Sequence, residues 1–375
     1  MYGKDLRSKS LSVAFGGATA LHPTDLDVEA GEILAVTGPS GSGKTTLLRT
    51  LAGHVVPTVG RVLIGGDDVT GTPPERRPSL FVSRDLALFP ALDVAENVAF
   101  GLEARGVGRG ERRQRAEALL DLVGLAGLAA HSVTGLPRET ALAVALARAL
   151  AIEPAVLLLD EPFAGLEPEA RRHARALLAR LHRRFRPTIV HATADPTEAV
   201  AFADRVAVLV DGRPEQIAPP DRLWSEPATL SVARHMGPQN LLAGRVVAVA
   251  GTRLEVETGL GIIRATARAP LAVGDPVEVT IRPERILLAT DRDERGRPGA
   301  DPAGWNALRG DLVGRTLEGA SVAYDFAVGD TRLVIVQPNL GPGGLLLANL
   351  HAFGFHAEEA LAFPAPAAAA GEGAP

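Results

Sequence analysis

Short, almost uninterrupted apolar runs alternate with amphipathic stretches through the first two thirds of the chain. Runs such as 32–37 and 155–159 are apolar at nearly every position, which is typical of strands buried on both faces of a sheet. Between them, stretches such as 116–125 and 138–152 repeat apolar residues at nearly helical spacing. Strands that alternate with helices predict a largely parallel α/β sheet.

The pattern changes after about residue 240. Apolar segments such as 241–249 and 277–281 are short, rich in β-forming residues and separated by Gly and Pro. This texture predicts a small all-β domain, either a barrel or a sandwich. Within it, the polar segment 291–304 predicts a mobile loop, and the Ala/Pro/Gly-rich tail 364–375 predicts disorder.

Composition narrows the class of protein. The chain has 375 residues, 46% of them hydrophobic, which is enough for two domains with cores of their own. A net charge of −5 gives no electrostatic footprint for nucleic acid. The absence of cysteine excludes disulfides and thiolate metal sites. We expect neither a signal peptide nor a membrane span, so that any membrane contact would go through a partner.

One stretch carries the clearest chemistry, because it matches the phosphate-binding pattern G-x-x-x-x-G-K-[ST]. It consists of Gly38, Pro39, Ser40, Gly41, Ser42, Gly43, Lys44, Thr45 and Thr46. Glycines let backbone N–H groups close around phosphates, and the helix that begins near Gly43 would point its positive end at the same anion. Lys44 would reach the β and γ phosphates, and the Thr45 hydroxyl would bind Mg²⁺. A chance match is disfavoured, because a predicted strand precedes the loop and a predicted helix follows it.

A second motif supplies the carboxylates that such a loop requires. Asp160 and Glu161 directly follow the apolar run 155–159. Asp160 would bind Mg²⁺, and Glu161 would polarise the attacking water as the catalytic residue. Acidic residues that merely end a strand are the alternative, and the P-loop makes that alternative the weaker one.

Together these motifs resemble the ATP-binding subunit of an ABC transporter, of the importer branch with a C-terminal TOBE domain. The resemblance implies an α/β P-loop NTPase with a mixed sheet and a helical subdomain at about 86–150, followed by a small all-β TOBE/OB-like domain. The domains would span residues 1–238 and 239–363. By the same resemblance, Phe15 would stack on adenine, and residues 85–102 would include the surface that receives the membrane permease.

One motif and three single positions depart from the family pattern. The signature motif falls on residues 136–140, where only its leucine remains, and a register shifted to 133–137 is the less favoured alternative. Arg84 stands where the family has a glutamine, Ala194 where it has a switch histidine, and Glu167 where it has an aspartate. The nearby His191 is interpreted as structural, because its offset in the strand points it elsewhere.

The resemblance therefore implies an importer subunit that uses ATP and Mg²⁺ to drive uptake of a polyamine or ferric iron. Its partners would be permease subunits, a second ATP-binding subunit in a homodimer or heterodimer, and, indirectly, a periplasmic or extracellular substrate-binding protein. It would lie on the cytoplasmic face of the inner membrane. The alternative is a catalytically impaired ATP-binding module that regulates a permease. A soluble P-loop kinase or a DNA-associated ATPase is disfavoured, since the first has no use for a TOBE domain and the second usually carries long coiled coils.

Overall fold

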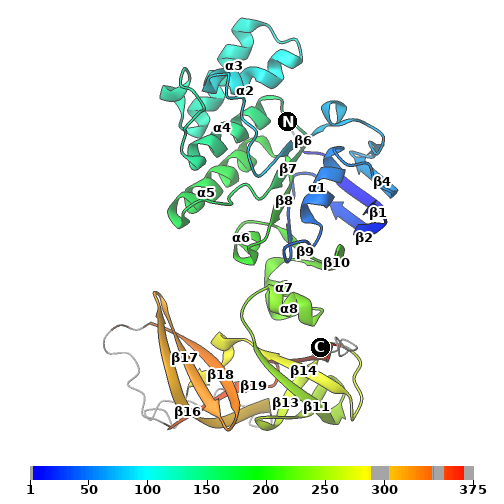
Figure 1. The fold of residues 1–375 in the computed structure, drawn as a ribbon, viewed down its shortest axis with the longest axis vertical. Helices are drawn as coiled ribbons and strands as arrows, with labels where there is room; N and C mark the ends of the chain where they lie inside the picture. The colour runs from blue at the N-terminus through cyan, green and yellow to red at the C-terminus, as the bar shows by residue number, and fades with distance from the viewer. Residues whose placement is uncertain (1–2, 289–303, 340, 342–349, 367–375) are drawn as a thin grey trace, which may run out of the picture. The chain divides into compact units, whose positions relative to one another are not determined.

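The computed structural model describes residues 3–288, 304–339, 341 and 350–366 and divides the chain into two compact units, Met1–Glu226 and Pro227–Pro375 (Figure 1). The predicted division lies later, between residues 238 and 239, and helix α8 (Leu230–His235) accounts for the difference. Arg234 of α8 donates to Glu278 of the second unit at 2.6 Å. The β-rich pattern begins only after this short helix, so the sequence pattern marks the boundary later than the contacts do.

Two sheets form the framework of the first unit. An antiparallel sheet of order β2-β1-β4-β5 contains β1 (Leu6–Phe15), β2 (Ala18–Val28), β4 (Val59–Ile64) and β5 (Asp67–Asp68). A six-stranded sheet of order β10-β9-β3-β8-β7-β6 contains β3 (Ile33–Thr37), β6 (Ser79–Val82), β7 (Val156–Asp160), β8 (Thr188–Thr193), β9 (Arg205–Val210) and β10 (Arg213–Ala218). Its neighbours run parallel except for the antiparallel pair β9 and β10. This is the mixed sheet that the family resemblance implies.

Burial on both faces explains the apolar runs of the central strands. Every residue of β3, β7 and β8 is buried. The helices of this unit include α1 (Lys44–Ala52), α5 (Pro168–Phe185), α6 (Pro196–Val200) and α7 (Pro220–Ser225). One core cluster joins both sheets and α1, with Leu21, Leu47 and Leu158 among its members. Because α1 follows β3 directly, the P-loop lies at the carboxyl edge of the sheet, where α/β proteins bind their ligands.

Three helices gather on one side of the first unit (Figure 1). They are α2 (Val94–Ala104), α3 (Arg109–Val123) and α4 (Arg138–Ala151). A capping box starts α2, since Asp93 accepts from the Glu96 N–H at 2.7 Å and Glu96 accepts from the Asp93 N–H at 3.0 Å. Among the described residues, no helix combines the length and the apolarity that a membrane span requires.

The second unit combines a closed barrel with a five-stranded sheet. The barrel has the order β11-β12-β13-β20-β14, from β11 (Asn240–Ala250), β12 (Arg253–Thr258), β13 (Gly261–Ala267), β14 (Pro276–Ile281) and β20 (Ala360–Pro364). The sheet has the order β15-β19-β16-β17-β18, from β15 (Leu287–Leu288), β16 (Trp305–Glu318), β17 (Ser321–Val328), β18 (Thr331–Pro338) and β19 (Leu350–His356). The prediction of an all-β domain is therefore confirmed, and of the two architectures that it left open the strand order shows a closed barrel, with a further five-stranded sheet.

Two buried asparagines join the barrel to this sheet. Asn240 of β11 donates to the Val334 carbonyl at 2.8 Å and accepts from the Val334 N–H at 2.7 Å. Asn306 of β16 makes the same paired contact with the backbone of Arg264, with both distances at 2.8 Å. Each side chain thus replaces a pair of backbone hydrogen bonds at a place where the two sheets meet.

The sequence predicts two irregular segments in this unit, the loop 291–304 and the tail 364–375. The predicted loop 291–304 lies outside the described residues, apart from residue 304. The tail predicted from residue 364 begins inside a strand, because Pro364 is the last residue of β20. The Ala365 N–H then donates to the Pro276 carbonyl at 3.0 Å. Strand β20 closes the barrel, and this pairing carries regular structure further than composition alone indicates.

Candidate nucleotide site

The P-loop connects β3 to α1 through a turn that only glycine fits at two positions. A Cβ on Gly38 would lie 1.9 Å from the Leu209 carbonyl oxygen. Gly43 caps α1 with a φ of 96°, and a Cβ there would lie 2.7 Å from the Ala20 carbonyl oxygen. The pattern of glycines in the motif is therefore a requirement of the backbone path as well as of phosphate access.

Lys44 is buried across this loop. Its Nζ donates to the carbonyls of Gly38 and Pro39, both at 2.8 Å, and to Ser42 Oγ at 3.3 Å. Burial lowers the pKa of Lys44, and the neighbouring carboxylates Glu161 and Asp160 act in the opposite direction. The loop thus presents a desolvated cation, which favours binding of an anion.

Asp160, the last residue of β7, and Thr45, in the first turn of α1, form an oxygen pair. Thr45 Oγ1 donates to Asp160 Oδ1 at 3.1 Å, and the Asp160 side chain is buried. Burial raises the pKa of Asp160, and the Thr45 hydrogen bond acts against this rise. A hydroxyl and a carboxylate are the oxygen ligands that Mg²⁺ prefers, so these residues fit the ion that the motif implies.

Glu161 follows Asp160 in a strained backbone conformation. Its φ is 46°, in the left-handed region that residues other than glycine rarely adopt. Its N–H donates to the Ala192 carbonyl at 2.9 Å, which ties this turn to β8. Its Oε2 lies 3.2 Å from Nη1 of Arg84, in the loop after β6. Strain of this kind persists where the surrounding structure enforces it, and it gathers at functional sites.

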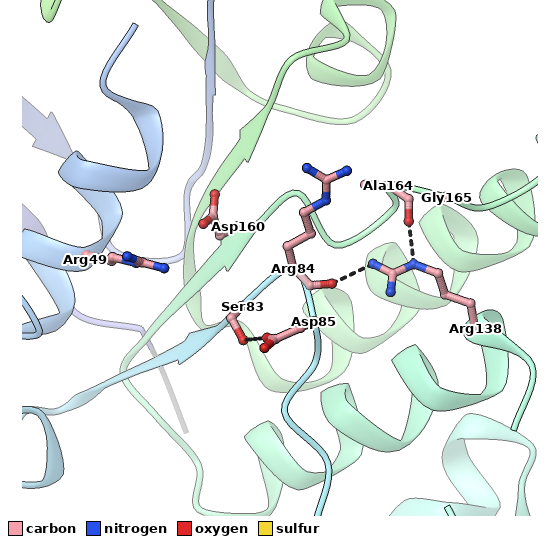
Figure 2. A pocket seen from close by; sticks show the side chains of 8 residues that line it. All are labelled: Arg49, Ser83, Arg84, Asp85, Arg138, Asp160, Ala164 and Gly165. Carbon is pink, nitrogen blue, oxygen red and sulfur yellow. Dashed lines mark hydrogen bonds between the residues drawn. The ribbon is translucent and has the colours of Figure 1, made fainter. Parts of the chain in front are cut away.

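A cavity of about 680 Å³ lies beside these groups (Figure 2). Its lining consists of Arg49, Ser83, Arg84, Asp85, Arg138, Asp160, Ala164 and Gly165. Figure 2 shows Arg49 directed toward Asp160 from one side, while Arg84 extends into the cavity from the other. The arrangement provides cations for a phosphate chain and a carboxylate for its metal ion.

The remaining predicted binding residues are more dispersed. Pro39, Ser40 and Gly41 form the exposed outer part of the loop, whereas Thr46 is half-buried within α1. Phe15 lies at the end of β1 in the antiparallel sheet, and its side chain is 53% exposed. The structure thus brings Lys44, Thr45, Asp160 and Glu161 together and places Phe15 on a separate element.

The positions that depart from the family pattern have clear places in the structure. Pro137 is the N-cap of α4, without a side-chain capping bond, and Glu167 takes the corresponding place before α5. Ala194 lies between β8 and α6. His191 is fully buried in β8, and its Nε2 lies 2.7 Å from Glu198 Oε1. The histidine therefore belongs to the interior of the sheet layer.

Sequence reasoning missed two side chains that hold the loop between β6 and α2. Asn97 is fully buried, and its Nδ2 donates to the carbonyls of Phe89, Leu92 and Asp93 at 2.9–3.1 Å. Arg148 donates to the carbonyls of Leu86 and Ala87 at 2.7 and 2.8 Å. The one available signal was Arg148 itself, a charge within the apolar stretch 141–152.

Comparison with known proteins shows which family the chain belongs to. A family model described as ABC transporter matches residues 21–164. The chain is 41% identical over 292 residues to the spermidine/putrescine import ATP-binding protein PotA of Rubrobacter xylanophilus, which covers 77% of each protein. The chain belongs to the ABC transporter family. This confirms the family resemblance.

A second relative and a solved structure support the assignment of this ABC chain. It is 37% identical over 330 residues to the Fe(3+) ions import ATP-binding protein FbpC 1 of Rhizobium meliloti, covering 88% of this chain and 90% of that one. Among solved structures, CbiO1 from Clostridium perfringens, described as part of the ABC transporter complex cbiONQ, is 29% identical with a TM-score of 0.54. That match covers 58% of this chain and 89% of CbiO1, and it supports the predicted ABC ATPase fold.

Proposed function

We propose that this ABC chain binds and hydrolyses ATP with Mg²⁺ as the energy-supplying subunit of an importer. One observation carries the proposal. Lys44, the Thr45–Asp160 pair and Glu161 meet at the carboxyl edge of the six-stranded sheet, beside a cavity lined by arginines. A buried cation, an oxygen pair for a metal ion and a partly exposed carboxylate are the groups that phosphoryl transfer to water requires.

Each group would have one role. Lys44 would leave the carbonyls of Gly38 and Pro39 and bind the β and γ phosphates. Thr45 and Asp160 would hold Mg²⁺, which neutralises charge on the phosphates when it is bound. Glu161 would accept a proton from water as the water oxygen bonds to the γ phosphorus and the bond to the bridging oxygen breaks, giving ADP and phosphate.

The transported substrate is proposed from the relatives. Their names assign them to spermidine/putrescine import and to Fe(3+) import. We propose that this chain serves an importer for one of these two classes of cation, at the cytoplasmic face of the membrane. The permease and a substrate-binding protein would select the substrate, and a second ATP-binding subunit would complete the dimer.

An aromatic pair is the proposed contact for the permease. Phe89 and Phe100 are 36% and 43% exposed, and their ring centroids lie 4.3 Å apart. Arg148 lies over the Phe89 ring, 5.1 Å from its centroid. Asn97 fixes the backbone of Phe89 from both sides, because it also accepts from the Phe89 N–H at 2.9 Å. Exposed aromatic rings on an anchored backbone suit an interface that must transmit movement.

The direct test is ATP hydrolysis by the purified chain and by its Glu161→Gln variant, together with an ATP-binding titration of both. We expect Mg²⁺-dependent turnover, a loss of about 10²–10⁴-fold in the variant, and similar ATP affinity in the two proteins. Equal turnover by both proteins would contradict the role of Glu161. Tight ATP binding without turnover by the unmodified chain would instead favour the regulatory module.

A further inference from the structure

Arg84 reaches the carboxylate that the proposed hydrolysis depends on. Its Nη1 lies 3.2 Å from Glu161 Oε2. Among the described residues, it is the cation that forms an ion pair with Glu161 within 4 Å. Figure 2 shows its guanidinium between Asp160 and Ala164, on the cavity side of the loop after β6.

The backbone that carries Arg84 is fixed from α4. Arg138 Nη2 donates to the Arg84 carbonyl at 2.6 Å, and its Nε donates to the Ala164 carbonyl. One side chain therefore links the start of α4, the loop after β6 and the loop after β7. Arg148 holds Leu86 and Ala87, two and three residues further along the chain, by their carbonyls. The Arg84 guanidinium thus extends from an anchored segment.

Glu161 needs such a partner to be oriented. Its side chain is 25% exposed, and the ion pair with Arg84 is the contact that orients the carboxylate. A general base must lie within hydrogen-bond reach of the proton that it removes.

We propose that Arg84 is a positioning residue for the hydrolysis, holding the Glu161 carboxylate directed at the water beside the γ phosphate. This inference rests on the proposed function. The Arg84 side chain is 70% exposed, and exposed ion pairs contribute little to stability, so loss of the pair should leave Tm nearly unchanged. A displacement of about 1 Å of a catalytic group, by contrast, costs up to ~10²-fold in rate.

The test uses the full-length chain and the variants Arg84→Gln, Arg84→Lys and the double variant Arg84→Gln/Glu161→Gln. A matched control is Arg113→Gln on α3, which removes another exposed Arg–Glu pair, 2.8 Å long, away from the cavity. Each protein is measured for kcat and KM with Mg²⁺ and ATP, for ATP affinity by titration, and for Tm.

We expect Arg84→Gln to lower kcat by about tenfold to a hundredfold while ATP affinity and Tm stay unchanged. Arg84→Lys should recover part of the rate, because an ammonium keeps the charge without the planar fork. In the Glu161→Gln background the Arg84 substitution should change little, since Arg84 acts through Glu161. The Arg113 control should match the unmodified chain in all four measurements.

Two results would overturn the inference while leaving the proposed function intact. A kcat that is unchanged or higher in Arg84→Gln would show that the guanidinium is neutral or obstructs Glu161. An equal loss with and without Glu161 would show that Arg84 acts by another route. An unmodified chain that binds ATP but does not turn it over would overturn the proposed function and this inference with it.

Discussion

The candidate site has two ends that hold their charged groups by opposite means. The P-loop end carries Lys44, and the arginine end carries Arg84. Lys44 is buried, and its three hydrogen-bond acceptors lie within six residues of it in the sequence. Arg84 is 70% exposed, and its position depends on Glu161 and Arg138, which are distant in the sequence. The first end is a local structure that a short motif specifies. The second is assembled by the tertiary fold, so its chemistry changes when single residues such as Arg84 change.

The largest effect should follow from removing the buried cation of the P-loop end. We expect Lys44→Ala to weaken ATP binding and to lower hydrolysis by at least about 10²-fold, because one charge-stabilising donor at a phosphate contributes that much. The measurements are an ATP-binding titration and steady-state hydrolysis. Lys9→Ala, an exposed lysine of β1, is the matched control and should behave like the unmodified chain. Unchanged hydrolysis in the Lys44 variant would contradict the role of Lys44 as the phosphate-binding cation of the P-loop end.

A smaller effect should follow from removing the side chain of Asn97, which holds the loop between β6 and α2 at the arginine end of the site. Asn97→Ala would remove the side-chain partner of three carbonyls and one N–H of the loop before α2. The carbonyls of Phe89 and Asp93 would keep one backbone N–H each. We expect a loss of about 2–3 kcal/mol in the free energy of unfolding, measured by urea denaturation, because buried polar groups without partners are costly.

Asn306→Ala is the control for that change, because it removes a similar pair of buried backbone contacts in the second unit. Both variants should lose stability, but only the Asn97 variant should speed hydrogen exchange in residues 86–93. Equal exchange in the two variants would show that Asn97 does not hold this loop.

The smallest effect concerns the charge of Asp160. Burial raises the pKa of this carboxyl above its value in the unfolded chain, so its protonated form stabilises the fold at low pH, and that contribution is lost as pH rises through the folded pKa. Without Mg²⁺ and ATP, Asp160→Asn should therefore raise Tm modestly at pH 7 and leave it nearly unchanged at pH 3. With Mg²⁺ and ATP, the unmodified chain should gain more in Tm than the variant, since the variant lacks the metal carboxylate. A variant that gains equally would show that Asp160 holds no metal ion.

The same contrast between local and tertiary structure explains which features could be predicted from the sequence. The buried strands β3 and β7 are apolar at nearly every position, so the sheet, the P-loop and the carboxylates at the end of β7 could be predicted from local patterns. The contacts of Arg138 with Arg84 and Ala164 depend on how α4 packs beside two loops, and no periodicity encodes that. The same holds for Asn240 and Asn306, whose partners lie in separate strands of the β unit.

Helix α8 and strand β20 show a second limit of prediction from sequence. Six residues of helix gave too short a pattern to separate the two units, and the polar contact of Arg234 with Glu278 decides where α8 belongs. Pro364, the last residue of β20, falls in the Ala/Pro/Gly-rich tail 364–375 whose composition predicts disorder, yet it pairs with Val277 of β14, and β20 closes the barrel. In both cases a tertiary contact outweighs local composition.

The most direct test of the account is a crystal structure of the Glu161→Gln variant with Mg²⁺ and ATP. The account predicts that Lys44 Nζ moves from the carbonyls of Gly38 and Pro39 to the β and γ phosphates, and that Thr45 and Asp160 flank the metal ion. It also predicts that the γ phosphate lies at the cavity lined by Arg84. A nucleotide bound elsewhere, or a Lys44 still bonded to its own loop beside bound ATP, would contradict it.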